Sequence, residues 1–332
     1  MRLLDCTLRD GANVVGNGFS AQLTESMIRG LLACGIRDIE LGNAKGLGAY
    51  EQAGARAPLT DLEYMALAEG YAGQGRLGMF LLAKCAREDK IQAAASHGLA
   101  FLRVGGNAGD GRASLEAVQM VKRAGLTCRY SLMKAYVSAP EELAEEARML
   151  EDAGVDAITI MDSAGTLLPE EVSHYVSAMK RKLSIPIGFH GHSNLGLSQA
   201  NALMAVQAGA EEVDCGLLGM ARSAGNCATE LAAAVFLREG LLKEVNLYQL
   251  LDYLDGELIP AMAAYDYRPA VRPVDLILGL SGCHSSYLET FRTIAKETGV
   301  SPYRLIMEVS AVDKKAPDLE LMRATAKKMQ NS

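Results

Sequence analysis

The stretch Asp152-Ala153-Gly154-Val155-Asp156-Ala157-Ile158-Thr159-Ile160-Met161-Asp162 contains the unit from which the fold can be predicted. An Ala-Gly pair closes a helical pattern, and the apolar run that follows it ends in a carboxylate. Glycine at this place fits the left-handed residue that terminates many helices. A continuous apolar run is typical of a parallel strand that helices cover on both faces. The stretch therefore predicts a helix that ends just before a buried parallel strand.

The same unit recurs along the chain, with glycine after a helical pattern at Gly98, Gly125 and Gly209. The predicted strands are residues 2–7, 36–41, 77–82, 100–104, 127–133, 156–161, 185–189 and 212–215. The predicted helices between and after them are residues 22–34, 61–72, 88–97, 114–124, 140–153, 169–182, 195–208 and 228–240. Strand–helix units repeated about every 30 residues predict an eight-stranded (β/α)8 TIM barrel over residues 1–240. A doubly wound open sheet is the rival fold, but it usually begins with a glycine-rich phosphate loop that this sequence lacks.

The alternation of strands and helices stops near residue 246. Residues 247–258, 282–298, 302–312 and 319–328 have helical patterns with no strands between them. They predict a small helical C-terminal region over residues 241–332, which would serve dimerisation, act as a lid or dock a partner. Within the part of the sequence predicted to form the barrel, residues 42–58 form a Gly- and Ala-rich loop, and its length suggests a function.

Composition excludes several classes of protein. The chain has 332 residues, a net charge of −7 and no long basic run, which argues against non-specific binding of nucleic acid or anionic membranes. No apolar segment is long enough to span a bilayer, and residues 1–5 do not resemble a signal or transit peptide. The seven cysteines are scattered and lack a Cys-x-x-Cys pair, so we expect reduced core residues in a cytoplasmic protein.

Two of the five histidines follow one predicted strand, in the sequence Gly188-Phe189-His190-Gly191-His192. Side chains at i and i+2 of an extended chain face the same way, so His190 and His192 can aim at one point. In a barrel, chemistry takes place at the carboxyl ends of the strands, where the carboxylates Asp10, Glu40 and Asp162 and some amide side chains also fall, so one carboxylate, two imidazoles and an amide can form a site for a divalent ion. This mixed oxygen and nitrogen ligand set favours Mn, Mg, Co or Fe(II) over structural zinc. The alternative is that both histidines are ordinary polar loop residues.

Other polar side chains at strand ends are expected to face a substrate. They are Arg9, Glu40, Arg103, Lys134 and Asp162. A divalent ion with open positions would bind a 2-oxo acid, polarise its carbonyl group and stabilise an enolate. Arg9 would hold the enolate oxygen by charge-assisted hydrogen bonds, although a surface ion pair with Asp10 explains the dipeptide equally well. Lys134 suggests a Schiff-base aldolase as a second chemistry, against the simpler interpretation of a solvated or ion-paired lysine.

Three motifs together carry a family resemblance. Asp5-Cys6-Thr7-Leu8-Arg9-Asp10-Gly11 is similar to the opening motif of the metal-dependent β/α-barrel lyases and condensing enzymes. His190 to Leu197 resembles their second signature, and Gly219 to Asn226 with Glu230 resembles their third. This superfamily includes isopropylmalate synthase, hydroxymethylglutaryl-CoA lyase and the 4-hydroxy-2-oxovalerate aldolases, and the likeness to the last group is closest. The resemblance implies that Asp10, His190 and His192 hold the metal, with Asn226 as a ligand used in some relatives, and that Arg9 steadies a pyruvate enolate.

The chain departs from those aldolases where they handle the aldehyde. Asn13 stands in place of their proton-shuttling histidine, and an amide cannot exchange a proton at neutral pH. His284 stands near their substrate-facing tyrosine, and Ala135 replaces a serine. His284 would take over proton transfer if the C-terminal region folded over the barrel mouth. Otherwise water would move the proton, and His284 would be an ordinary histidine on a packed helix.

The sequence therefore predicts a divalent-metal-dependent aldolase that cleaves or forms a 4-hydroxy-2-oxo acid, with altered aldehyde specificity. Mn²⁺ is the expected ion, and Mg²⁺, Co²⁺ and Zn²⁺ are the other candidates. One alternative is an acyl-CoA-dependent Claisen condensing enzyme or lyase, for which Lys45 and Arg56 are the cations of the 44–56 loop. Another is a non-catalytic barrel subunit that docks an aldehyde dehydrogenase. A homodimer is expected, and an active enzyme would also be able to pair with such a dehydrogenase.

Overall fold

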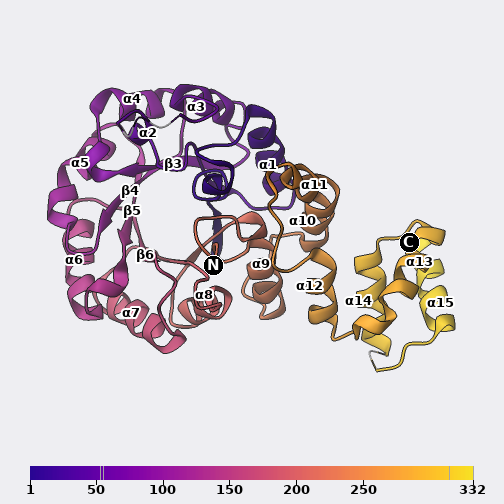
Figure 1. Cartoon of the computed structure of the whole chain (residues 1–332). Coiled ribbons are helices and arrows are strands. Elements are labelled where there is room, and N and C mark those ends of the chain that lie inside the picture. The colour runs from indigo at the N-terminus through magenta and orange to yellow at the C-terminus, as the bar shows by residue number, and fades with distance from the viewer. Residues whose placement is uncertain (53, 55, 314, 332) are drawn as a thin grey trace.

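The computed structural model describes residues 1–52, 54, 56–313 and 315–331. At its centre is a closed barrel of parallel strands in the order β1 to β8, with β8 paired back to β1 (Figure 1). The strands are β1 (Arg2–Asp5), β2 (Asp38–Leu41), β3 (Arg76–Leu82), β4 (Phe101–Asn107), β5 (Thr127–Met133), β6 (Ala157–Asp162), β7 (Ile187–Gly191) and β8 (Glu212–Cys215). Each lies within a few residues of its prediction, so the predicted (β/α)8 barrel is confirmed.

Helices surround the barrel and connect its strands (Figure 1). They are α1 (Ala21–Ala33), α3 (Asp61–Glu69), α4 (Glu88–Ser96), α5 (Gly111–Arg123), α6 (Pro140–Asp152), α7 (Pro169–Lys182), α8 (Ser198–Gln207) and α9 (Thr229–Arg238). A short helix, α2 (Ala49–Gln52), lies in the stretch 42–58 that was predicted to be a loop. Positions 53 and 55 of that stretch fall outside the described residues.

The repeated glycines act as the sequence predicts. Gly98, Gly125, Gly154 and Gly209 all have positive φ, from 70° to 112°. Each follows the last turn of a helix and turns the chain back toward the next strand. A side chain would strain this left-handed conformation, which explains why glycine marks these positions.

The barrel interior holds charged side chains in two layers along its axis. Nearer the amino ends of the strands, Arg129 donates to Asp38 over 2.8 Å and to Glu212 over 2.7 Å. Two residues further along β2 and β8 lie Glu40 and Asp214, which share the buried Arg103 of β4. Because buried charges require such pairing, these ion pairs fix the inward-facing side chains of four strands. The second layer is the floor of the candidate site.

The regular elements of the C-terminal region, over its described residues, are all helices. They are α10 (Leu247–Tyr253), α11 (Ile259–Met262), α12 (Pro273–Ser281), α13 (Leu288–Thr298), α14 (Pro302–Val312) and α15 (Leu319–Gln330). The predicted helix over 247–258 is interrupted by a π-helical turn at Leu254–Leu258, and that over 282–298 begins only at Leu288. The unexpected α12 begins with Pro273 in its first turn and ends at Gly282 in the left-handed conformation.

The helices α10 and α12 pack on the barrel helices, whereas α13, α14 and α15 form a group beside the barrel (Figure 1). In this structure the group lies beside the barrel mouth, and a role as a lid stays a prediction. The roles in dimerisation or docking, and the domain boundary at residue 240, stay predictions. In the part of the chain that the structure describes, no helix combines the length and apolar character that crossing a bilayer requires.

Candidate metal centre and active site

Three side chains that are far apart in sequence converge at the carboxyl end of the barrel. Asp10 lies in the turn after β1, His190 lies in β7, and His192 follows that strand directly. The Asp10 Oδ2 atom is 3.7 Å from Nε2 of His190 and 3.8 Å from Nε2 of His192. All three ligand atoms lie within 4.8 Å of one another. These separations exceed hydrogen-bond length but suit atoms that surround one ion at about 2.0–2.2 Å each.

The environment keeps these three groups in the states that bind a cation. Burial raises the pKa of Asp10, but Arg9 and the two imidazoles outweigh burial and hold this pKa well below its usual range. Burial, together with the adjacent His190, lowers the pKa of His192 to about 4. An ionised carboxylate and a neutral imidazole are the forms that act as metal ligands.

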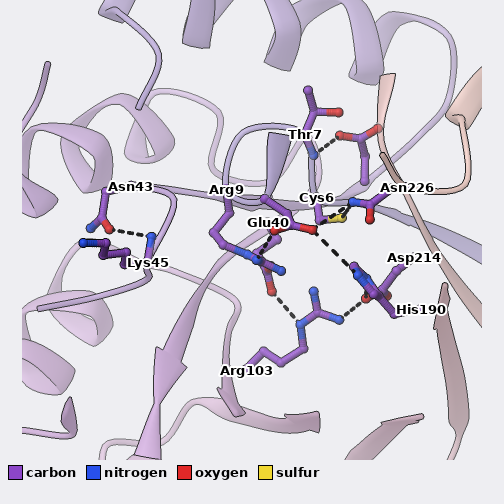
Figure 2. Close-up of polar contacts among 12 residues, drawn as sticks. Cys6, Thr7, Arg9, Glu40, Asn43, Lys45, Arg103, His190, Asp214 and Asn226 are labelled. Atoms are coloured by element: carbon purple, nitrogen blue, oxygen red, sulfur yellow. Dashed lines mark hydrogen bonds and ion pairs between the residues drawn. The ribbon is translucent and has the colours of Figure 1, made fainter. Parts of the chain in front are cut away.

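His190 is oriented from behind by Asp214 of β8. The Nδ1 atom of His190 lies 3.0 Å from Oδ2 of Asp214, and Arg103 pairs with the same carboxylate (Figure 2). Burial opposes ionisation, but Arg103 and His190 together lower the pKa of Asp214 to about 2. An ionised Asp214 accepts a hydrogen bond from Nδ1–H of His190. The Nε2 atom of that ring then carries the lone pair, which points toward Asp10. Carboxylates commonly fix metal-ligating histidines in this way.

Asn226 and Asn13 both contact the Asp10 carboxylate. Asn226 donates from Nδ2 to Oδ2 of Asp10 over 3.0 Å, and its own Oδ1 is buried without a partner among the described residues. An oxygen left in this way is available to a cation, so the donor set fits a divalent ion with oxygen and nitrogen ligands. Asn13 donates from Nδ2 to the backbone oxygen of Asp10 over 2.8 Å and, over a longer 3.4 Å, to its carboxylate Oδ1. The structure therefore gives Asn13 a positioning contact with a predicted ligand.

Arg9 joins the predicted ligands to the charged floor beneath them. Its Nη1 lies 2.9 Å from Oδ1 of Asp10, and its Nε donates to Glu40 over 2.7 Å (Figure 2). Burial raises the pKa of Glu40, but Arg103 and Arg9 overcome it and lower this pKa. The third nitrogen of Arg9, Nη2, is buried and has no partner within the described parts of the chain. Arg9 therefore has one donor free for a ligand.

A pocket of about 800 Å³ opens above this cluster at the barrel mouth, within the usual range for small-molecule sites. Arg9, Asp10, His190 and His192 line its base, and Lys134 lines it as predicted. A groove of about 730 Å³ lies at the opposite end of the barrel. The pocket with the candidate ligands is the relevant one, since chemistry in these barrels takes place at the carboxyl ends.

Several predicted substrate contacts are corrected by the structure. Glu40, Arg103 and Asp162 are completely buried and do not line the pocket. Glu40 and Arg103 point into the barrel and pair with each other, whereas Asp162 accepts two backbone N–H groups of the loop after β6. Their polar contacts in this structure are therefore with other groups of the protein, and their predicted contact with a substrate is not supported by the lining of the pocket.

His284 is not brought to the predicted metal ligands either. It is exposed on the C-terminal region, where its Nδ1 caps a short turn with Ser286, and it does not line the pocket. This residue was expected to reach the barrel mouth only if the C-terminal helices folded over it, and they lie beside the barrel instead. Proton transfer by His284 is therefore not supported in this arrangement.

Three residues of the site escaped the sequence analysis. Asp214 lies within the predicted strand 212–215, where an acidic residue in a buried run is a signal that could have been followed. Lys84 and Arg222 line the pocket from the loops after β3 and β8. Nothing in the sequence distinguishes them from other surface cations, because only the fold brings these loops together.

Comparisons with known proteins identify a family and related folds. Residues 1–255 match the model of a family described as HMGL-like. The chain is 33% identical over 308 residues to the 4-hydroxy-2-oxovalerate aldolase of Roseiflexus sp. (strain RS-1), covering 93% of this chain and 90% of that protein. It is 31% identical to the 4-hydroxy-2-oxovalerate aldolase of Geobacillus genomosp. 3, covering 93% and 91%. The fold is similar to hydroxymethylglutaryl-CoA lyase from Pseudomonas aeruginosa, with a TM-score of 0.69, 17% identity and 84% and 97% of the two chains covered.

Proposed function

The chain belongs to the HMGL-like family of enzymes, and from this premise we propose that it is a divalent-metal-dependent aldolase acting on a 4-hydroxy-2-oxo acid. The relatives named 4-hydroxy-2-oxovalerate aldolase, at about 30% identity over most of the chain, support a carbon–carbon lyase. The proposal adds a pyruvate-type enolate as the reacting species and an aldehyde that differs from that of those relatives.

The observation that carries the proposal is the cluster of Asp10, His190 and His192 at the base of a mouth-side pocket. Asn226 would complete the ligand set through its unpartnered Oδ1. A divalent ion bound there would polarise the carbonyl group of a 2-oxo acid. Mn²⁺ is the ion we propose, because carboxylate, amide and imidazole ligands together suit it.

Arg9 would stabilise the negative charge that develops on the enolate. Its guanidinium is held by Glu40 and Asp10, so its free Nη2 donor is fixed in direction before the substrate binds. A pre-oriented donor stabilises a developing charge without reorganisation during the reaction. Asn13 keeps Asp10 in place, and we assign the proton transfer at the 4-hydroxyl group to water.

The first experiment tests enolate formation without any aldehyde. Enzyme loaded with Mn²⁺ is incubated with pyruvate in D₂O, and loss of the methyl proton signal is followed by NMR. We expect exchange that EDTA abolishes and Mn²⁺ restores. Alanine at Asp10, His190 or His192 should abolish it, whereas His174→Ala, on the exposed face of α7, should not.

Two results would count against the proposal. Full exchange after the metal has been stripped would exclude a metal-dependent mechanism. Wild-type protein that neither binds metal nor exchanges protons would favour the alternative of a non-catalytic barrel that docks a dehydrogenase. Pairing with a dehydrogenase and formation of a homodimer are separate proposals, which co-purification and sedimentation measurements test.

A further inference from the structure

We propose that the electrophile of this enzyme carries an anionic group, a phosphate ester or a second carboxylate, which binds to a ring of cations at the pocket mouth. This inference rests on the proposed function and specifies its unnamed aldehyde. The ring, called here the rim cations, consists of Lys45, Lys84, Lys134 and Arg222. None of the four could be linked to the others from sequence spacing.

The rim cations come from four different loops of the barrel. Lys45 follows β2, Lys84 follows β3, Lys134 follows β5 and Arg222 follows β8, and all four line the pocket that contains the predicted metal ligands. All four side chains are exposed, and within the described residues none has an ion-pair partner. Figure 2 shows Lys45 on its loop, apart from the buried pairs of Arg9 and Arg103. Unpaired cations are free to bind a ligand.

The pocket has the opposite charge to the protein as a whole. The chain carries a net charge of −7. Yet Asp10 is the only carboxylate among the described residues that line the pocket, and Arg9 pairs with it. A cleft lined by one sign of charge concentrates ligands of the other sign. A neutral aldehyde would gain nothing from this arrangement.

The depth of the pocket separates two binding regions. Arg9, Asp10 and His190 are almost completely buried at its base, and the 2-oxo acid with its own carboxylate is proposed to bind there. The rim cations lie at the exposed end. The aldehyde must approach the enolate from the open side, so its substituent is brought among them.

Two of the loops hold unfavourable backbone conformations at the rim. Lys134 has φ 55°, and its N–H donates to Ser163 Oγ over 3.0 Å. Ser223, beside Arg222, has φ 58° and accepts a hydrogen bond from Asn194 over 2.7 Å. Non-glycine residues rarely adopt this left-handed conformation, and such strain gathers at functional sites. Side-chain contacts from neighbouring loops maintain these conformations. The backbone that carries Lys134 and Arg222 is therefore held in place at the rim.

The chemistry requires no further reactant. The methyl carbon of pyruvate loses a proton to solvent and forms a bond to the aldehyde carbon, whose oxygen then takes up a proton. No electrons are gained or lost. A phosphate ester carries about −1.5 to −2 charges at neutral pH, so four cations suit it better than a single carboxylate.

A binding experiment tests the rim cations directly. Glycerol 3-phosphate, glycerate and glycerol serve as unreactive probes in calorimetric titrations. We expect the phosphate to bind, the carboxylate to bind more weakly, and glycerol not to bind. Each of Lys84→Gln, Lys134→Gln and Arg222→Gln should weaken the binding of glycerol 3-phosphate about fivefold, the factor in Kd that ~1 kcal/mol represents. The matched control is Lys243→Gln at the opposite end of the barrel, which should change nothing. Lys243 is exposed, and the described residues offer it no ion-pair partner.

A kinetic experiment separates this inference from the proposed function. With pyruvate saturating, kcat/KM is compared for glyceraldehyde 3-phosphate, glyoxylate and glyceraldehyde. We expect the anionic aldehydes to be preferred at least tenfold, and each rim substitution to reduce that preference. If pyruvate exchanges its protons but the neutral aldehyde reacts equally well, this inference alone is overturned. If no exchange occurs, the proposed function fails first. Thiol release from acetyl-CoA with a 2-oxo acid would overturn both the proposed function and this inference, since the rim would then bind the phosphates of coenzyme A.

Discussion

Replacing Asp214 by Asn should weaken metal binding although Asp214 is not itself a predicted ligand. Its Oδ2 accepts a hydrogen bond from Nδ1–H of His190 over 3.0 Å, which leaves the lone pair of Nε2 of that ring free to bind the ion. An amide can present its NH₂ group instead, and the ring would then lose its preferred tautomer. Removing such a partner typically costs 10–100-fold in metal affinity, or about 1.4–2.8 kcal/mol. Mn²⁺ titration of stripped protein, followed by the paramagnetic resonance of the free ion, measures this loss.

The substitution also leaves Arg103 buried beside a neutral group, which should cost about 3 kcal/mol of the free energy of unfolding. Asp38→Asn is the matched control, because Asp38 is equally buried and is also paired with arginines, Arg76 and Arg129. It lies at the opposite end of the barrel. We expect both variants to lose stability in urea and only Asp214→Asn to lose metal affinity. Equal metal affinity in the two variants would refute the argument that Asp214 orients His190.

Three further predictions concern backbone, pH and thiols. Gly165→Ala should lower both stability and Mn²⁺ affinity, because its Cβ would lie 2.5 Å from the carbonyl oxygen of His192. Gly196→Ala, with φ 73° and open space around the new methyl group, should cost only about 1–2 kcal/mol of backbone strain. Urea denaturation and metal titration of both variants check this. Burial raises the pKa of Glu230 from 4.5 to about 7. The native state therefore holds this proton more tightly than the unfolded state, and stability should fall by up to about 3 kcal/mol as pH rises from about 4.5 to 7. Glu230→Gln, whose amide oxygen can still accept from the Leu218 N–H, should be more stable than wild type at pH 8 but not at pH 4 in urea titrations. The seven cysteines are buried thiols, so a thiol reagent should label none of them quickly until the protein unfolds, and rapid labelling of the native protein would contradict this.

Sequence reasoning succeeded where the signal is local. The glycines at 98, 125, 154 and 209 and the apolar runs after them located β4, β5, β6 and β8, and apolar runs alone located the other four strands, because helix ends and buried strands depend mainly on neighbouring residues. The gathering of Asp10, His190 and His192 followed from the topology alone. Parallel strands in a closed barrel bring their carboxyl ends to one face whatever the details of packing.

The predictions from sequence were wrong where the position of a side chain depends on its depth in the barrel or on how helices pack. Arg103 was expected at the mouth, but strand register places it one layer down, between Glu40 and Asp214. A shift of two residues along a strand keeps the direction of a side chain while moving it by roughly 6–7 Å, and the sequence does not reveal this depth. His284 depended on how the C-terminal helices pack, which no local pattern specifies.

The chain by itself determined the barrel and the order of its strands, because these depend on periodicity and on the closure of a parallel sheet. It also indicated the three predicted ligands, through their places at strand ends and the likeness of the motifs around them to those of the family. Only the tertiary structure decided which groups support the ligands and which surround the mouth. The pairing of Asp214 with His190 and the assembly of Lys45, Lys84 and Arg222 around one pocket join loops that are far apart in sequence. Such pairings depend on the three-dimensional distances between side chains, and the spacing of residues along the chain does not contain those distances.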